Sequence, residues 1–223
     1  MFNRSEPNLS CPLCAHFTVT PFHQDKKREY LRCVQCALVF VPAQFHLSAE
    51  DEKAEYDKHE NDVTDSGYVN FLQRAANPLL ERLSTVSTRL SGLDFGCGPA
   101  PALAELLQAA GHNVALYDYY YHPDNAVLSR QYDFVTCTEV IEHFNQPAEG
   151  WAQLLSLLKP QGHLVIMTKL VIDEARFSQW HYKNDPTHVS FFSRETFDFL
   201  ADKHHLSVEY VGNDVILFQS RTG

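Results

Sequence analysis

The chain has no long apolar run. Its longest uninterrupted stretch of apolar residues covers six positions, Cys36 to Val41, whereas a membrane-spanning helix needs about 20. Residues 1–10 are polar and contain no apolar segment of the kind found in secretory signals. The sequence therefore predicts a cytoplasmic protein with no membrane partner.

An excess of basic residues is also missing. The 223 residues include 18 Lys and Arg against 28 Asp and Glu, a net charge of −10, which argues against nucleic acid as the main partner. Residues 1–47 carry a net charge of +2, so the rest of the chain carries −12. Acidic residues gather between Glu50 and Asp65, a pattern typical of a solvated linker or helix face.

Low-complexity tracts and internal repeats are absent from the chain as well. With 44% hydrophobic and 21% charged residues, the composition is that of a globular protein and excludes general disorder. The length is enough for one full domain and a small additional module.

Four of the six cysteines form two Cys-x-x-Cys pairs near the N-terminus: Cys11, Cys14, Cys33 and Cys36. A reducing compartment makes a disulfide framework unexpected. A two-residue gap lets both thiolates of a pair face one metal, and two pairs complete a closed tetrahedral zinc site. An iron–sulfur centre and ligand-free cysteines are the alternatives. A closed site does not catalyse, so the sequence predicts a structural or recognition role.

The small size of this N-terminal module, residues 1–47, leaves little apolar material for a core of its own. Metal ligation would therefore supply much of its folding energy. The cores of the module and the larger domain are expected to be separate, so Cys33→Ser should unfold the module and leave the larger domain mostly folded.

Strand and helix patterns alternate through the rest of the chain. A helix is expected over 67–87, and an antiparallel hairpin over 206–220 closes the pattern. This order predicts an α/β fold with a mostly parallel sheet covered on both faces. The expected strands span 90–95, 113–118, 132–138 and 163–168, and the helices between and after them span 101–110, 151–158 and 193–204.

A glycine-containing turn follows the first of these strands. The segment Asp94-Phe95-Gly96-Cys97-Gly98-Pro99 precedes a helix, where glycines let the backbone approach a ligand and the helix offers unpaired N–H groups. Asp118 ends the next strand, where a carboxylate suits two ribose hydroxyls. Pro101 stands where a dinucleotide fingerprint has its third glycine.

Two later segments complete the pattern. They are Tyr132-Asp133-Phe134-Val135-Thr136-Cys137-Thr138-Glu139-Val140-Ile141-Glu142-His143 and Leu158-Lys159-Pro160-Gln161-Gly162-His163-Leu164-Val165-Ile166. Together with the glycine turn and Asp118, they resemble the class I S-adenosylmethionine-dependent methyltransferases over about residues 67–220. A zinc ribbon ahead of such a domain is similar to that of bacterial methyltransferases with an N-terminal zinc module.

This resemblance implies a doubly wound, seven-stranded Rossmann-like sheet with S-adenosylmethionine as cofactor. It also implies a division into a zinc ribbon (1–47), an acidic linker and helical cap (48–89) and a methyltransferase domain (90–223). The cofactor-binding positions that it suggests are Asp94, Gly96, Cys97, Gly98, Asp118, Tyr119, Thr138 and Glu139.

One departure from the family concerns the segment after Asp118. Only 14 residues separate Asp118 from Asp133, too few for a full helix and a third strand. The sheet is therefore expected to be shortened, and the usual acid that contacts adenine has no counterpart. The tyrosines at 119, 120 and 121 either line the adenine or pack the shortened edge.

The Glu-x-x-Glu-His pattern resembles ubiquinone-pathway O-methyltransferases and small-RNA 2′-O-methyltransferases. In those families these positions bind a divalent ion, and in the RNA enzymes a further histidine takes part. The resemblance implies a second metal site at Glu139, Glu142, His143 and His188. In a metal-free alternative the segment serves packing, and His188 or Asp185 is the base, with His143 beside them at the catalytic site.

Two further segments are predicted to face the ligands. Residues 180–188 are rich in aromatic and imidazole side chains and suit a substrate loop. Tyr56, His59 and Tyr68 are predicted to close the cofactor pocket.

Three functions are compatible with the sequence. The first is transfer of a methyl group to a small molecule, most simply to an oxygen nucleophile. The second is RNA modification, which the basic ribbon leaves open. The third is a zinc-ribbon binding protein with an inactive methyltransferase-like domain. The sequence does not identify the acceptor or the oligomeric state.

Overall fold

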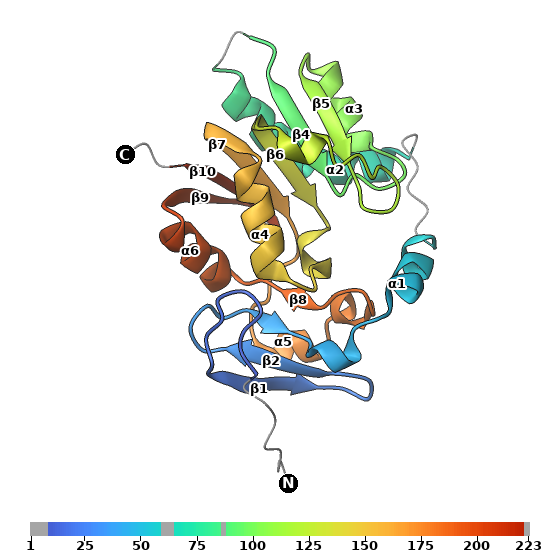
Figure 1. Ribbon diagram of the computed structural model, residues 1–223, viewed down its shortest axis with the longest axis vertical. Coiled ribbons are helices and arrows are strands. Elements are labelled where there is room, and N and C mark those ends of the chain that lie inside the picture. The colour runs from blue at the N-terminus through green and yellow to red at the C-terminus, as the bar shows by residue number, and fades with distance from the viewer. Residues whose placement is uncertain (1–8, 59–64, 86–87, 221–223) are drawn as a thin grey trace.

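The computed structural model describes residues 9–58, 65–85 and 88–220, and these residues contain two sheets. The larger sheet has six strands in the order β5-β4-β6-β7-β10-β9 (Figure 1). Its strands are β4 (Ser91–Phe95), β5 (Asn113–Tyr117), β6 (Tyr132–Thr138), β7 (Leu158–Met167), β9 (Leu206–Val211) and β10 (Val215–Ser220).

Strands β5, β4, β6 and β7 run parallel, and the β9–β10 hairpin joins antiparallel to β7. Side chains along β7 alternate between the two faces of the sheet. Leu164 and Ile166 belong to the same core as α4 and α6, whereas Val165 and Met167 pack with α2 and α3. Both faces are covered, which confirms the doubly wound α/β prediction. These helices are α2 (Ser66–Leu83), α3 (Ala102–Ala109), α4 (Pro147–Ser156) and α6 (Arg194–Lys203).

The expected seven strands are reduced to six. Between β5 and β6 the chain forms an isolated bridge from Asp118 to His122 and a short 3₁₀ helix, η2 (Val127–Ser129), but no strand. The segment is too short for a helix and a strand, so β5 becomes the sheet edge. The shortened form of the prediction is the correct one.

A second sheet carries the N-terminal cysteines. It consists of β1 (Val19–Gln24), β2 (Glu29–Cys33), β3 (Val39–Phe40) and β8 (Ser190–Phe191). We call residues 9–47 the ribbon. The fourth strand comes from the distant C-terminal half of the chain, so in Figure 1 β8 lies between the ribbon and the larger sheet.

The expectation of separate cores is wrong. Cys33, Leu38 and Phe40 of the ribbon belong to the same apolar cluster as Trp151 and Phe197 of the larger domain. The ribbon gains burial by packing on the larger domain, and its metal site need not compensate for a missing core.

The first part of the acidic stretch lies in helix α1 (Ala49–Tyr56), whose N-cap Ser48 accepts a hydrogen bond from the Asp51 N–H. It lies beside the larger sheet rather than in either core (Figure 1). No helix within the described ranges combines the length and apolarity needed to cross a lipid bilayer.

Candidate functional site

The four N-terminal cysteines converge on one point. The distance between Cys11 Sγ and Cys36 Sγ is 3.5 Å, as is that between Cys14 Sγ and Cys33 Sγ, and all four sulfurs lie within 4.8 Å of one another. Four thiolates at about 2.3 Å from one zinc ion would be separated by similar distances. The arrangement is therefore compatible with a zinc ribbon.

Both pairs use the same local backbone. The residue after each second cysteine, Ala15 or Ala37, has a positive φ of 61° or 58°, and its N–H donates to the carbonyl of the first cysteine at 2.9 or 3.0 Å. Each tight turn brings its two sulfurs to the same side. Repetition of this strained turn is evidence that the cysteines are arranged for a ligand.

We expect one zinc ion per chain in the purified protein, measured by elemental analysis. Cys33→Ser should lose the metal and lower the melting temperature of the whole chain, because the ribbon core continues into the larger domain. Cys97→Ser, a cysteine outside the cluster, is the matched control and should keep its zinc. Protein with neither zinc nor iron would contradict the prediction.

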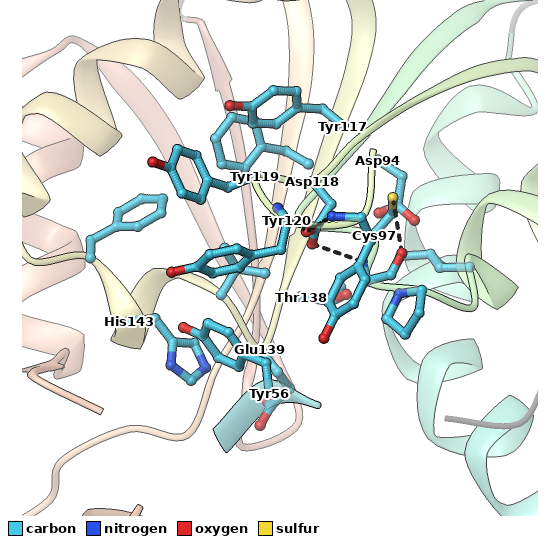
Figure 2. A pocket seen from close by; sticks show the side chains of 18 of the residues that line it. Tyr56, Asp94, Cys97, Tyr117, Asp118, Tyr119, Tyr120, Thr138, Glu139 and His143 are labelled. Carbon is cyan, nitrogen blue, oxygen red and sulfur yellow. Dashed lines mark hydrogen bonds between the residues drawn. The ribbon is translucent and has the colours of Figure 1, made fainter. Parts of the chain in front are cut away.

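A large pocket opens beyond the carboxyl ends of β4, β5 and β6, with a volume of about 900 Å³. Figure 2 shows side chains from these three strand ends and from α1 turned toward it. Open α/β sheets bind ligands at this edge. The pocket brings together all eleven residues predicted for cofactor binding or catalysis: Asp94, Gly96, Cys97, Gly98, Asp118, Tyr119, Thr138, Glu139, His143, Asp185 and His188.

The turn after β4 requires glycine for two reasons. Gly96 and Gly98 have φ values of +76° and +64°, a region that side chains with a Cβ rarely adopt. A Cβ on Gly96 would also lie 2.3 Å from Cγ2 of Val140. The Gly96 N–H donates to the Tyr117 carbonyl at 2.7 Å, which fixes the turn to the end of β5.

Asp94 lies at the base of this turn and is buried. Thr136 Oγ1 on the neighbouring strand donates to Asp94 Oδ1 at 2.7 Å. Burial raises the pKa of the Asp94 carboxyl to about 6, since a charged carboxylate is disfavoured away from water. A cationic group in the pocket would stabilise its charged form.

Asp118 organises the loop at the edge of the sheet. Its Oδ2 accepts from the Gly98 N–H at 3.0 Å, and its Oδ1 accepts from the N–H groups of Tyr120 and Tyr121 at 2.9 and 3.0 Å. The carboxylate therefore joins the glycine turn to the tyrosine loop. A carboxylate provides about four lone-pair sites, so it can still accept from a ligand hydroxyl.

The tyrosine loop and α1 form one wall of the pocket. Tyr120 OH donates to Glu52 Oε2 at 2.8 Å, and the Tyr56 ring lies 5.6 Å from the Tyr120 ring and 5.1 Å from the His143 ring. Tyr56 and Tyr68, predicted to close the cofactor pocket, both line the cavity, whereas His59 lies outside the described residues. Glu52 was missed, because a charged residue in an acidic run gives no sign that it faces a pocket.

The Glu-x-x-Glu-His segment divides between the pocket and the protein interior. Glu139 follows β6 with a positive φ of 52°, a strained conformation for a residue with a Cβ. Glu142 is fully buried and accepts from Thr168 Oγ1 at 3.0 Å and from Tyr182 OH. Burial raises the pKa of both glutamates. Glu139, Val140 and His143 line the pocket, whereas the Glu142 side chain does not.

His188 approaches from the opposite side. Its Nδ1 lies 2.7 Å from the Tyr182 carbonyl oxygen, and a carbonyl can only accept, so Nδ1 carries the proton. In the neutral imidazole Nε2 is then the unprotonated, basic nitrogen. The centroids of the His143 and His188 rings lie 4.6 Å apart. The predicted metal site and the metal-free base both require these two histidines to be close together.

Three of the four residues predicted for a second metal are close together. One donor atom each from Glu142, His143 and His188 lies within 4.8 Å of the other two. Glu139 is not part of this group. One carboxylate and two imidazoles suit a transition metal with open positions for other ligands, so these three residues fit such an ion.

The aromatic segment 180–188 has two functions in the structure. Trp180 and Tyr182 pack with Phe177 and Phe191 in a cluster between the ribbon and the larger domain, while Asp185 and His188 line the pocket. Asp185 and His188 are thus placed where a substrate loop would need them, and the substrate loop itself stays a prediction. Tyr182, a hydrogen-bond partner of Glu142, is a supporting residue that composition alone did not distinguish.

Comparison with known proteins agrees with this geometry. A family model described as a methyltransferase domain matches residues 68–211. Ubiquinone biosynthesis O-methyltransferases from Serratia proteamaculans (strain 568) and Acinetobacter baumannii (strain AYE) are 30% identical over 90 residues and 32% identical over 93 residues. Each match covers 40% of this chain but only 37% or 38% of the relative.

The fold has solved counterparts as well. Magnesium protoporphyrin IX methyltransferase from Synechocystis PCC 6803, with bound S-adenosylhomocysteine, has a TM-score of 0.53. It is 18% identical, and the match covers 79% of this chain and 96% of that protein. At this identity the likeness concerns the fold alone.

Proposed function

This chain belongs to the methyltransferase-domain family, and from that premise we propose that it transfers a methyl group from S-adenosylmethionine to an oxygen nucleophile of a small molecule. The observation that carries the proposal is the pocket itself. The glycine turn at Gly96, which has no room for a side chain, lines one cavity with the Asp118 carboxylate. The imidazoles of His143 and His188 line the same cavity.

The cofactor half of the pocket is the part around the glycine turn. Gly96 and Gly98 leave room for the methionine portion, and Asp118 would accept from a ribose hydroxyl at the lone-pair site that the backbone N–H groups leave open. Cys97, Tyr119, Thr138 and Glu139 complete the proposed contacts. With no third strand to supply an acid for adenine, the exposed Tyr119 ring is the proposed stacking surface.

The acceptor half is bounded by His143, Asp185 and His188. When bound, S-adenosylmethionine supplies an electrophilic methyl group for an in-line displacement. The chain's part is to align the acceptor oxygen and to take its proton. His188 Nε2 is the proposed base because its Nδ1–H is held by the Tyr182 carbonyl. Asp185 Oδ2, 3.8 Å from Nε2, would stabilise the resulting imidazolium.

A divalent ion is the second way to activate the acceptor. Glu142, His143 and His188 would hold it, and it would lower the pKa of a coordinated hydroxyl. We propose the metal-free base as the primary form, because both Glu142 oxygens already accept hydrogen bonds from Thr168 and Tyr182.

The charge of the side chains that line the pocket argues against RNA as the methyl acceptor. The described residues that line it include six acidic side chains, two of which (Asp94 and Glu139) have a pKa raised by burial, but no lysine or arginine. Such a wall suits a sulfonium cofactor and repels phosphate, whereas nucleic-acid sites use basic contacts. A neutral small-molecule acceptor is therefore the proposal. The named activity of the ubiquinone-pathway relatives, O-methylation, supports an oxygen acceptor.

Titration with S-adenosylhomocysteine tests the cofactor half. We expect binding to the wild type, and Asp118→Ala should weaken it by about 1.5–3 kcal/mol, or roughly 10- to 100-fold, the cost of a lost charged hydrogen bond. Asp133→Ala is the matched control, because Asp133 accepts from the Ser91 N–H and Lys159 outside the pocket.

The titration also has a negative outcome. No heat with the wild type at high ligand concentration would favour the inactive, zinc-ribbon binding protein. An unchanged affinity in Asp118→Ala would show that the ribose lies elsewhere. Acceptors can then be sought with radiolabelled S-adenosylmethionine and a panel of phenols and catechols.

A further inference from the structure

The ribbon contributes one buried cation to the region behind the acceptor side of the pocket. Arg28 precedes β2, at the end of the β1–β2 hairpin, and only 7% of its surface is exposed. Burying a guanidinium is costly unless its N–H groups are satisfied. Its position therefore needs a reason in the contacts that it makes.

The hydrogen bonds that its guanidinium donates go to one segment, residues 183–188. Arg28 Nη1 donates to the carbonyl oxygens of Pro186 at 3.1 Å and His188 at 2.9 Å. Its Nη2 donates to the Asp185 carbonyl at 2.9 Å and also to the Lys183 carbonyl. One planar fork of donors thus satisfies four backbone carbonyls of a segment that leads from the short helix η4 (His181–Asn184) into β8.

Two further ribbon residues hold the same segment. Tyr30 OH lies 3.3 Å from the Lys183 carbonyl oxygen and donates to Asp25 Oδ2 at 2.9 Å. Lys183 Nζ is 3.4 Å from the same Asp25 carboxylate oxygen. We call Asp25, Arg28 and Tyr30 the ribbon clamp.

The opposite side of the segment faces the pocket. Asp185 and His188, whose carbonyls are bound by Arg28, have side chains that line the cavity. The next residue, Val189, bridges the two parts of the molecule: its N–H donates to the Glu142 carbonyl and its carbonyl accepts from the Val41 N–H, both at 2.9 Å. The clamp therefore fixes the backbone at the residues whose side chains reach the pocket.

We propose that Arg28 is a positioning residue, which holds segment 183–188 so that His188 and Asp185 are directed into the acceptor side of the pocket. This inference rests on the proposed function, because it assigns the acceptor side to those two residues. It gives the ribbon a part in organising the site. Removing the guanidinium would take away the donor that the structure gives to the Pro186 and His188 carbonyls, and one of the donors to the Lys183 and Asp185 carbonyls, and let the segment relax.

Arg28→Lys is the most informative variant. Lysine keeps the charge and most of the stem, but its ammonium has three donors and no planar fork, so it cannot serve all four carbonyls. Arg32→Lys is the matched control. Arg32 lies on the same hairpin and also reaches the larger domain, but its partner is Glu195 at 2.6 Å.

The readouts do not depend on a known acceptor. Hydrogen exchange reports on the amides of residues 187–189, and nitrogen NMR of labelled histidine reports on the His188 ring. In Arg28→Lys we expect exchange in this segment to rise about tenfold with shifted His188 signals. Affinity for S-adenosylhomocysteine should stay within about twofold, because the cofactor half is untouched. Arg32→Lys should change neither readout.

Two results would overturn the proposal. One is unchanged exchange and histidine signals in Arg28→Lys, and the other is a rise spread evenly over the chain, which would mean a merely structural role. If Arg28→Lys fails to fold, Tyr30→Phe can replace it, because it removes only the hydroxyl that faces the Lys183 carbonyl. It should give a smaller rise in hydrogen exchange, confined to the same segment. A uniform rise in exchange, or no rise, would count against the clamp. Absence of cofactor binding in the wild type would refute the proposed function but leave these readouts interpretable.

Discussion

Replacing Gly96 by valine is expected to abolish measurable binding of S-adenosylhomocysteine, a loss of more than about 100-fold, or roughly 3 kcal/mol. Two physical effects combine at this position. The φ of +76° is strained for any residue with a Cβ, and the new Cβ would lie 2.3 Å from Val140. The branched side chain would either enter the cofactor space or push the turn out of place.

Gly111 offers the matched control for strain alone. It has a φ of +100°, nothing lies within 4 Å of a Cβ built on it, and it is outside the pocket. Gly111→Val should lower the melting temperature and leave cofactor affinity unchanged. If Gly96→Val binds the ligand as the wild type does while remaining folded, the cofactor does not approach the glycine turn. Isothermal titration and thermal melts measure both quantities.

His188→Ala is expected to lower the rate of methyl transfer by about 10²–10⁴-fold, the usual contribution of a general base. The imidazole is held in one tautomer by the Tyr182 carbonyl and offers Nε2 beside His143. The rate should be measured with labelled S-adenosylmethionine and the phenol or catechol that the acceptor panel identifies. Affinity for S-adenosylhomocysteine should survive, because His188 belongs to the acceptor half.

Adding a chelator distinguishes a metal-free general base at His188 from a divalent-metal site. For a metal-free base, chelator should leave the rate unchanged under conditions in which the zinc of the ribbon stays bound. If the rate falls and returns with a divalent ion, while cofactor affinity persists, Glu142, His143 and His188 form a metal site and the metal-free version is wrong. His205→Ala is the control variant, since His205 neither lines the pocket nor belongs to the group of Glu142, His143 and His188. A normal rate in His188→Ala would contradict both versions.

Local patterns in the chain were enough to predict most of the fold. β6 begins and ends at the predicted residues, and the β9–β10 hairpin spans the predicted 206–220, because short apolar, β-rich runs bounded by turns specify strands on their own. The glycine turn and Asp118 were equally readable, since a positive φ and a carboxylate at a strand end are properties of single positions. The shortened edge followed from chain length between Asp118 and Asp133.

Other features depended on residues far apart in the sequence. The four carbonyls that Arg28 binds lie more than 150 positions away, and nothing in a hairpin arginine signals such partners. The same holds for β8, two residues long, which exists as a strand only because it pairs with β3. Short strands gain their stability from the neighbouring strand rather than from their own sequence.

The sequence by itself determined the order of strands and helices, the cysteine pairs and the cofactor turn, because these depend on local conformation and on spacing. Only the tertiary structure decided that the ribbon and the larger domain share a core, and that Glu142 turns inward while His143 and His188 meet at the pocket. Burial and the meeting of side chains depend on which surfaces pack together. That is a property of the whole chain, and no single segment encodes it.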